Sequence, residues 1–221
     1  MYRMELHCHT QGVSKCAEYP PEKAAELYIE EGYAGVVVTD HMNRHTFSHF
    51  DKETPWEQQI EHFMSGYRRF HAAAGDRLTV LLGMELRFDE NDNDYLVYGA
   101  DEEFLLHHPE MMAMKPASFA QLARQEGLLF YQAHPFRDGM TVIPPQYLDG
   151  IEVWNGHPNH DSRNEIALAW AEKFGLKQIG GSDFHFPEAC GKGGIVTERP
   201  ILDIPTLLDV LKNQQYEIYR G

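Results

Sequence analysis

The stretch Met4-Glu5-Leu6-His7-Cys8-His9-Thr10 stands near the start of the chain and contains two histidines separated by one residue. Successive side chains of a β-strand point to opposite faces, so His7 and His9 share one face and Cys8 occupies the other. Two imidazoles that lie about 7 Å apart along a strand can bind the same divalent ion. A single His-x-His pair is a weak signal, and its interpretation depends on the rest of the chain.

Four further apolar stretches also end in His, Asp or Glu. They are Val36–His41, Val80–Glu85, Leu129–His134 and Ile179–His185. Five strand ends that carry metal-type side chains are difficult to explain by chance. Because the carboxyl ends of parallel strands meet at one edge of a sheet or barrel, we expect these side chains to form one metal centre.

Predicted strands and helices alternate along the whole chain. Strands are expected over residues 4–10, 34–39, 78–86, 95–98, 128–133, 150–154, 176–179 and 195–197. Helices are expected over residues 20–32, 56–74, 101–107, 116–126, 161–174 and 205–213. The polar segment 41–49 is expected to be a loop or lid. Such alternation predicts a mainly parallel sheet covered by helices, and ligand residues at the strand ends favour a closed (β/α) barrel. No linker or repeat divides the chain, which predicts one domain over residues 1–221.

Composition narrows the class of protein. The formal net charge is −15, which argues against nucleic acid as a partner because phosphate binding requires clustered Lys and Arg. No apolar run reaches the length of a membrane span, no signal peptide is evident, and three cysteines do not suggest a disulfide framework. We therefore expect a cytoplasmic protein without membrane contact. Among its 13 histidines, five are expected to be ordinary surface or core residues: His62, His71, His107, His108 and His160.

Taken in order, the motifs resemble those of the polymerase-and-histidinol-phosphatase (PHP) superfamily across essentially the whole chain. The matching motifs are Leu6–Thr10, Thr39–His41, Gly83–Glu85, Ala133–Pro135 and Gly181–His185, and Ile151–Asn155 is similar to the strand before the last of them. The resemblance implies a distorted (β/α)7 barrel of the TIM-barrel-like type that holds up to three divalent metals. It also implies, in most members, a phosphoesterase activity.

The resemblance further implies a division of ligands among the metals. His7, His9, Glu85 and Asp183 surround one metal, and Glu85 bridges to a second, which His134 also holds. His41 and His185 hold the third.

Two positions depart from the family pattern. Asp94 precedes a short strand where members often have a histidine, so we expect its carboxylate to complete the second site. Ser14-Lys15-Cys16 stands where members often have His or Asp. We expect an inert or supporting role for Cys16, with a thiolate ligand as the alternative.

The proposed ligands predict both the metal and the charge of the substrate. Imidazoles combined with a few carboxylates suit Zn, Mn or Fe, whereas Ca and Mg prefer oxygen shells. Two to three such ions would outweigh the charges of Glu85, Asp94 and Asp183, so the pocket suits an anionic substrate. Binding to zinc lowers the pKa of a water molecule from roughly 16 to about 7. We therefore expect a metal-bridging hydroxide to attack phosphorus in line.

Five other residues are candidates around the metals. Asp40 is expected to orient a ligating imidazole, although a simple turn role remains open. Arg137 can hold phosphate through two parallel hydrogen bonds, or it can form a structural ion pair. Arg87 and Asn155 are further candidates for substrate binding, as is His157.

The sequence thus predicts a metal-dependent phosphoesterase that hydrolyses a small soluble phosphate ester. Two alternatives remain open at this stage. One is a metal-dependent hydrolase of another bond, similar to an amidohydrolase, and the other is a non-catalytic accessory module.

Overall fold

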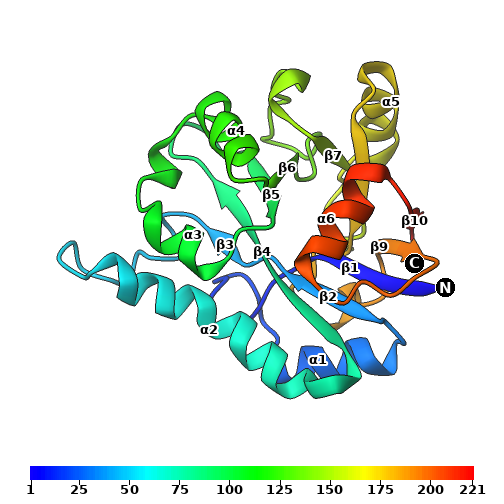
Figure 1. Ribbon diagram of the computed structural model, residues 1–221, viewed down its shortest axis with the longest axis horizontal. Helices are drawn as coiled ribbons and strands as arrows, with labels where there is room; N and C mark the ends of the chain where they lie inside the picture. Colours follow the sequence, from blue (N-terminus) through cyan, green and yellow to red (C-terminus); the bar gives the residue numbers. More distant parts are fainter.

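A central β-sheet with helices around it is the main feature of the computed structural model, which describes all residues from 1 to 221 (Figure 1). The strands are β1 (Tyr2–Cys8), β2 (Gly35–Val38), β3 (His41–Met42), β4 (Thr79–Arg87), β5 (Asp94–Tyr98), β6 (Leu129–Gln132), β7 (Gly150–Asn155), β8 (Lys177–Gly181), β9 (Gly194–Thr197) and β10 (Glu217–Tyr219). The helices are α1 (Pro21–Glu30), α2 (Trp56–Ala74), α3 (Glu102–His107), α4 (Pro116–Gln125), α5 (Asn164–Phe174) and α6 (Ile204–Asn213).

The sheet curls into a nearly closed barrel, which confirms the expected fold class. Strands β1, β2, β4, β5, β6, β7 and β8 follow one another around it, and β9 and β10 extend the sheet from the start of β1. Closure between the first and last of these strands involves residues just beyond β8. Cys8 bridges Phe184 there, with hydrogen bonds from His9 N to Phe184 O (2.9 Å) and from Phe184 N to His7 O (3.1 Å).

The barrel departs from a regular parallel one at β5. This strand is antiparallel to both β4 and β6, whereas β1–β2, β2–β4, β6–β7 and β7–β8 are parallel pairs. The first residue of an antiparallel strand lies at the same edge as the last residues of its parallel neighbours. Asp94 begins β5 and is therefore at the same mouth of the barrel as the other candidate ligands.

Two short strands were not predicted from the sequence. The segment 41–49, expected to be a loop or lid, begins with β3, in which His41 pairs with Glu85 of β4, and then continues as turns. At the other end of the chain, β10 pairs with β9. Two residues give too little hydrophobic alternation to be recognised as a strand. Here β3 follows directly from the backbone bond between Glu85 N and Asp40 O (3.0 Å).

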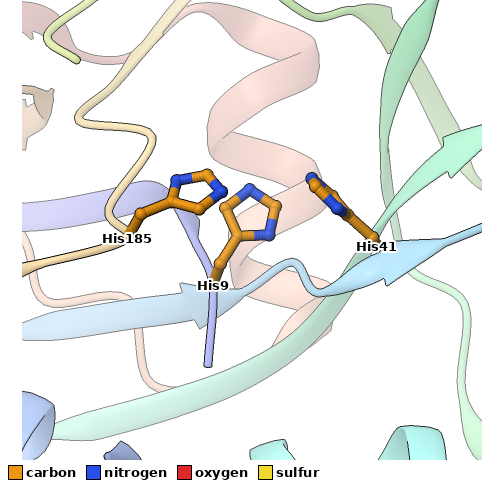
Figure 2. Close-up of side chains that lie close together, drawn as sticks. All are labelled: His9, His41 and His185. Atoms are coloured by element: carbon orange, nitrogen blue, oxygen red, sulfur yellow. The ribbon is translucent and has the colours of Figure 1, made fainter. Parts of the chain in front are cut away.

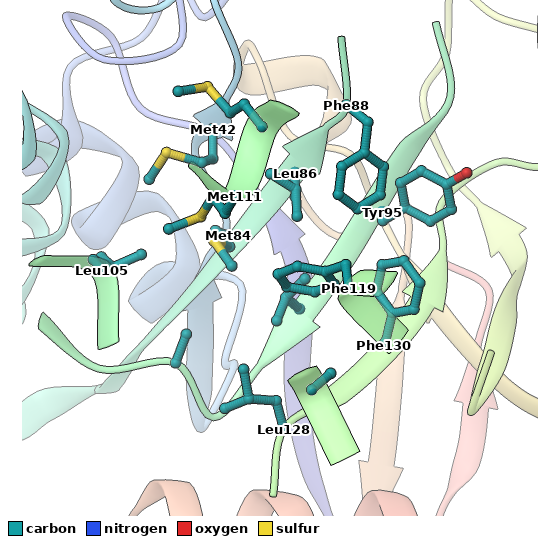
Figure 3. Close-up of a cluster of buried hydrophobic side chains, with 14 of the residues drawn as sticks. Met42, Met84, Leu86, Phe88, Tyr95, Leu105, Met111, Phe119, Leu128 and Phe130 are labelled. Carbon is teal, nitrogen blue, oxygen red and sulfur yellow. The ribbon is translucent and has the colours of Figure 1, made fainter. Parts of the chain in front are cut away.

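Successive side chains of β4 point alternately into the hydrophobic core and into the candidate site. Met84 and Leu86 point outward into the largest hydrophobic cluster with Phe88, whereas Glu85 and Arg87 point into the barrel mouth. Figure 3 shows the outward cluster, in which the ring of Phe88, directly after β4, packs with rings from β5, β6 and α4. The Tyr95 and Phe130 rings, for example, are stacked with centroids 4.8 Å apart.

Helix α6 closes the end of the barrel opposite the mouth. Its buried residues Leu207, Val210 and Leu211 pack against Met4 and Leu6 of β1 and against inward-facing residues of other strands. Helices α1 and α2 cover the outside of β1 and β2. No helix of the protein combines the length and the apolar character that crossing a membrane requires.

Strand β1 contains one extra residue relative to β2. Glu5 pairs with Val36 and Cys8 with Val38, so three steps along β1 match two along β2. This bulge lets Leu6 face the barrel interior and the next residue, His7, face the candidate ligands. The expected alternation therefore holds from His7 to His9, with Cys8 packed in the outer core, but not before His7.

Candidate metal centre

All eight candidate ligands lie together at the mouth of the barrel. Glu85, at the centre of the group, is within 2.8–3.3 Å of four imidazoles. Its Oε1 atom is 3.2 Å from His7 Nε2 and 3.1 Å from His134 Nε2. Its Oε2 atom is 3.3 Å from His9 Nε2 and 2.8 Å from His41 Nε2. A single buried carboxylate in this position can be shared between metal ions.

The remaining ligands surround Glu85 in sets that suit separate ions. His7, His9 and Glu85 form a first set, and Asp183 Oδ1 lies 3.4 Å from His7 Nε2 and 3.3 Å from His9 Nε2. A second set combines Glu85, Asp94 and His134. A third consists of His9, His41 and His185, whose rings come from three different segments of the chain and face one another (Figure 2).

Hydrogen bonds to the far side of two imidazoles fix which nitrogen faces the carboxylates. His7 Nδ1 is 2.9 Å from Glu152 Oε1, so that nitrogen carries a proton. His9 Nδ1 lies 3.1 Å from Ser14 Oγ, which uses its own proton in a 2.7 Å bond to Asp40. The Nε2 atoms of His7 and His9 are both buried and have no hydrogen-bond partner.

A cation fits between these nitrogens and the carboxylates. An unprotonated Nε2 and a carboxylate oxygen are both acceptors, so their approach to about 3.3 Å is repulsive unless a positive charge lies between them.

The pKa values of the His7 and His9 rings agree with a positive charge at this position. Burial alone lowers the pKa of His7, but Asp183, Glu152 and Glu85 outweigh it and raise that pKa well above its usual value. Burial, with His185 and His41, holds the pKa of His9 well below its usual value. A divalent ion held here would supply the positive charge that a proton on His7 otherwise brings.

The centre opens into a cavity of about 310 Å³. Six of its lining residues are candidate ligands, and the others include two arginines and two further histidines. The lining comprises Cys16, Glu18, His41, Glu85, Arg87, Asp94, His134, Arg137, Met140, His157, Asn159, His160, Asp183, His185 and Phe186. His160, expected to be an ordinary surface histidine, therefore belongs to the cavity wall.

The family of the chain follows from comparison with family models. A model described as the PHP domain matches residues 5–182, and a second, described as PHP-associated, matches residues 161–216. The chain belongs to the PHP family. Its clustered imidazoles and carboxylates fit the metal-dependent hydrolases of that superfamily. A comparison with curated proteins gives no match.

Several solved structures share the fold. PsfC from Pseudomonas syringae has 18% sequence identity and a TM-score of 0.69, and the match covers 100% of this chain and 93% of that one. A two-domain protein from Bacteroides vulgatus containing a predicted PHP-like metal-dependent phosphoesterase has 15% identity and a TM-score of 0.64, with 100% and 65% covered. The lesion-specific endonuclease Q from Pyrococcus furiosus has 14% identity and a TM-score of 0.63, with 98% and 57% covered. The chain thus spans less than two thirds of the latter two proteins.

Within this PHP fold, Asp94 and Arg87 form a bidentate ion pair. They are directly opposed in the β4–β5 ladder, and the Arg87 Nε and Nη2 atoms each donate to one Asp94 oxygen at 2.7 Å. Asp94 Oδ2 is 3.9 Å from His134 Nε2. Burial and the charge of Glu85 raise the pKa of Asp94, and the bond from Arg87 opposes this rise. Arg87 therefore offsets the charge that Asp94 brings to the second ligand set.

Arg137 forms the ion pair that was one of its two expected roles, and it also lies at the cavity. Its Nη2 atom donates to Asp183 Oδ2 (2.7 Å) and to Asn155 Oδ1 (3.0 Å), while the residue also lines the cavity. Its buried Nε has no partner. Asn155 also donates to Asp183 Oδ2 at 3.2 Å, so this candidate substrate-binding residue supports the carboxylate from the side.

Asp40 acts on the centre through an intermediate residue. It is buried, accepts hydrogen bonds from Thr10 N (2.7 Å) and from Ser14 Oγ, and does not line the cavity. The direct bond to a ligating imidazole that we expected is replaced by the relay through Ser14 to His9. Helix α2 approaches Asp40 so closely that a Cβ atom added at Gly66 would lie 2.6 Å from Asp40 Oδ2.

Two candidate ligands adopt strained backbone conformations. His134 has a φ of 28° and Asp183 a φ of 53°, values that L-residues rarely adopt. Glu152 helps to hold the first of these, since His134 N donates to Glu152 Oε2 at 2.9 Å. Strain of this kind is concentrated at functional sites, where the surrounding structure enforces it.

Glu152 is the main site residue that the sequence interpretation missed. It accepts from His7 Nδ1, from His134 N and from Asn155 Nδ2 (2.9 Å), so one carboxylate orients two candidate ligands. The available signal was a buried acid within the apolar strand 150–155. Glu5 gave the same signal in β1, and its carboxylate accepts from Leu6 N, His7 N and Ser182 N.

Proposed function

We propose that this PHP-family protein is a metal-dependent phosphoesterase that acts on a small soluble phosphate ester. The observation that carries the proposal is the set of unpartnered imidazole nitrogens that face Glu85 and Asp183 across about 3.3 Å. Bound divalent metals would supply Lewis-acid polarisation of a phosphoryl oxygen and a water that ionises near neutral pH.

The chain's own residues add recognition of an anion. Arg137 lines the cavity beside its ion pair with Asp183, so its guanidinium can also donate to phosphate. His157 also lines the cavity. Asn159 N donates to His157 Nδ1 at 3.2 Å, which leaves the proton of the neutral ring on Nε2. Burial lowers the pKa of His157 to about 4, so the ring is a neutral donor at physiological pH.

Cavity size and surface charge favour a small substrate over nucleic acid. A cavity of about 310 Å³ is at the lower end of the range for small-molecule sites. Five arginines that could contact a phosphate backbone pair with acidic residues instead. These pairs are Arg44–Asp89, Arg68–Glu61, Arg69–Glu22, Arg77–Glu26 and Arg163–Asp138.

The test is a panel of substrates with metal-loaded protein. It should contain phosphomonoesters, a small phosphodiester, simple amides and a DNA duplex with an abasic site. We expect hydrolysis of a small ester that depends on metal, two to three metal equivalents per chain by elemental analysis, and loss of activity on chelation.

Each alternative has its own result in this panel. Hydrolysis of amides alone would identify an amidohydrolase-like enzyme, and cleavage of the duplex alone would identify a nuclease. Metal binding without turnover on any class would indicate an accessory module. Full turnover by metal-free protein would contradict the proposal directly.

A further inference from the structure

The thiol of Cys16 lies against the third set of candidate ligands. Its Sγ atom is 3.0 Å from His185 Nε2 and 3.8 Å from His41 Nδ1. The side chain is exposed and lines the cavity of the metal centre. An exposed thiol in contact with two imidazoles from separate segments contributes little to packing, so its contacts call for a different explanation.

A third imidazole completes this group. The His9 ring lies between those of His41 and His185, with centroids 4.4 Å and 4.3 Å away (Figure 2). His9 has no exposed surface, and its Nε2 atom has no hydrogen-bond partner. A fully buried imidazole nitrogen without a partner costs free energy unless a ligand satisfies it. That nitrogen faces Glu85 and Asp183, so the ion of the third set is left to His41 and His185, which with His9 offer nitrogens that lie within 4.8 Å of one another.

We propose that the Cys16 thiolate is a ligand of the metal ion held by His41 and His185. The inference rests on the metal-dependent function proposed above and assigns to the thiol the coordinating role that the sequence left as the alternative. Binding of the ion displaces the thiol proton to solvent, and a sulfur–metal bond forms without any change of oxidation state.

The atomic separations suit this role. Metal bonds of about 2.3 Å to sulfur and about 2.1 Å to nitrogen at tetrahedral angles put the two ligand atoms roughly 3.6 Å apart. The two observed separations, 3.0 Å and 3.8 Å, lie on either side of that value. Both contacts are therefore close to the separation that two ligands of one metal ion adopt.

A thiolate ligand gives the third ligand set a metal preference that the first two sets lack. The first two sets combine imidazoles with carboxylates, whereas the third would combine imidazoles with a soft sulfur ligand. Thiolates favour Zn and other borderline or soft ions over Mn and Mg. We therefore expect the third ion to differ in identity or affinity from the other two when hard and soft metals compete.

The other thiols of the chain serve as internal controls. Cys8 and Cys190 are both buried in the core cluster that includes Tyr28, away from the cavity lining. Neither is available as a ligand, so any thiol signal from bound metal reports on Cys16.

The experiment loads the full chain with cobalt(II) and records its near-ultraviolet absorption. We expect a thiolate-to-cobalt charge-transfer band in the parent protein and in Cys190→Ser, and no such band in Cys16→Ser. Zinc should slow alkylation of Cys16 by iodoacetamide about tenfold or more, because the coordinated thiolate is no longer free to react. Cys16→His, which replaces sulfur by nitrogen, should keep the metal content of the parent while losing the band.

An unchanged cobalt spectrum in Cys16→Ser, or alkylation of Cys16 at the same rate with and without zinc, would overturn the assignment. If both proteins still hydrolyse a phosphate ester in a metal-dependent way, the proposed function stands although the thiol role fails. If neither protein binds cobalt or zinc, both proposals are wrong.

Discussion

The Nδ1 atom of His7 lies 2.9 Å from Oε1 of Glu152, and this contact fixes the direction in which the other ring nitrogen faces. His7 is at the end of β1 and Glu152 is in β7, on opposite sides of the β8 strand end. Because Nδ1 carries the proton, Nε2 presents a lone pair to Glu85 and Asp183. The arrangement of the centre thus depends on a residue that is not itself one of the candidate ligands.

Replacement of Glu152 by Gln should weaken metal binding without removing a ligand. The amide supplies one acceptor where the carboxylate serves His7, His134 N and Asn155, so the His7 ring loses its fixed tautomer. Loss of such an orienting partner typically lowers metal affinity 10- to 100-fold. Competition with a chromophoric chelator measures the effect, and the exposed Glu172→Gln provides a matched control. Equal affinities in Glu152→Gln and the parent would remove Glu152 from the centre.

The buried carboxyl group of Glu5, in β1, predicts a pH dependence of the free energy of unfolding. Burial raises the pKa of Glu5 from 4.5 to about 7, against hydrogen bonds from Ser182 and His7 that lower it. A carboxyl with a raised pKa stabilises the folded state fully below the unfolded value of 4.5, and this contribution is lost as pH rises through about 7.

Glu5→Gln should therefore gain stability relative to the parent as pH rises from 5 to 8. The amide oxygen can still accept from Leu6 N, His7 N and Ser182 N, and its NH2 group can donate to Tyr28 Oη. The relative gain is at most roughly 3 kcal/mol. Urea unfolding of both proteins at the two pH values, with equal metal content, gives the difference. A difference that does not change with pH would show that Glu5 ionises normally.

The clustering of the candidate ligands could be predicted from the sequence because strand alternation and strand ends are local properties. His7, His9, Glu85 and Asp183 are ordered by the periodicity of their own segments, and the barrel brings the segments together. Supporting contacts are different, because they depend on how distant segments approach. Ser14 and Asp40 meet His9 only after β2 is placed beside β1.

The hydrophobic pattern of the sequence also could not predict the irregular features of the sheet. A bulge in β1 and another in β7, between Glu152 and Trp154, each shift side chains out of simple alternation. The antiparallel direction of β5 follows from the tight β4–β5 connection, which leaves no room for a crossover helix. Helix and strand types were predicted well where the apolar period was long, as in α2, and poorly where two or three residues pair, as in β3 and β10.

Arg137→Lys should distinguish substrate binding from a structural ion pair. Lysine keeps the charge beside Asp183 but cannot offer two parallel donors to phosphate. We expect KM for a phosphate ester to rise about tenfold while metal content stays the same. Arg44→Lys, in an exposed pair with Asp89, is the matched control. Unchanged kinetics combined with lost metal or a lower Tm would assign Arg137 to the support of Asp183 alone.

Asp94 provides the last test, because its ion pair with Arg87 changes what a carboxylate does at the second ligand set. If Asp94 holds a metal with Glu85 and His134, Asp94→Ala should lose one metal equivalent, and Asp94→His should retain it with a shift toward zinc. Arg87 donates to both Asp94 oxygens, so the added negative charge is largely offset. The bias toward Mn or Fe over Zn should then be smaller than for a free carboxylate.

Asp92 is exposed two residues earlier and does not line the cavity, which makes Asp92→Ala the matched control. Metal analysis after dialysis against equimolar Zn and Mn measures both effects. Full metal occupancy and an unchanged rate in Asp94→Ala would mean that Asp94 serves only to pair with Arg87.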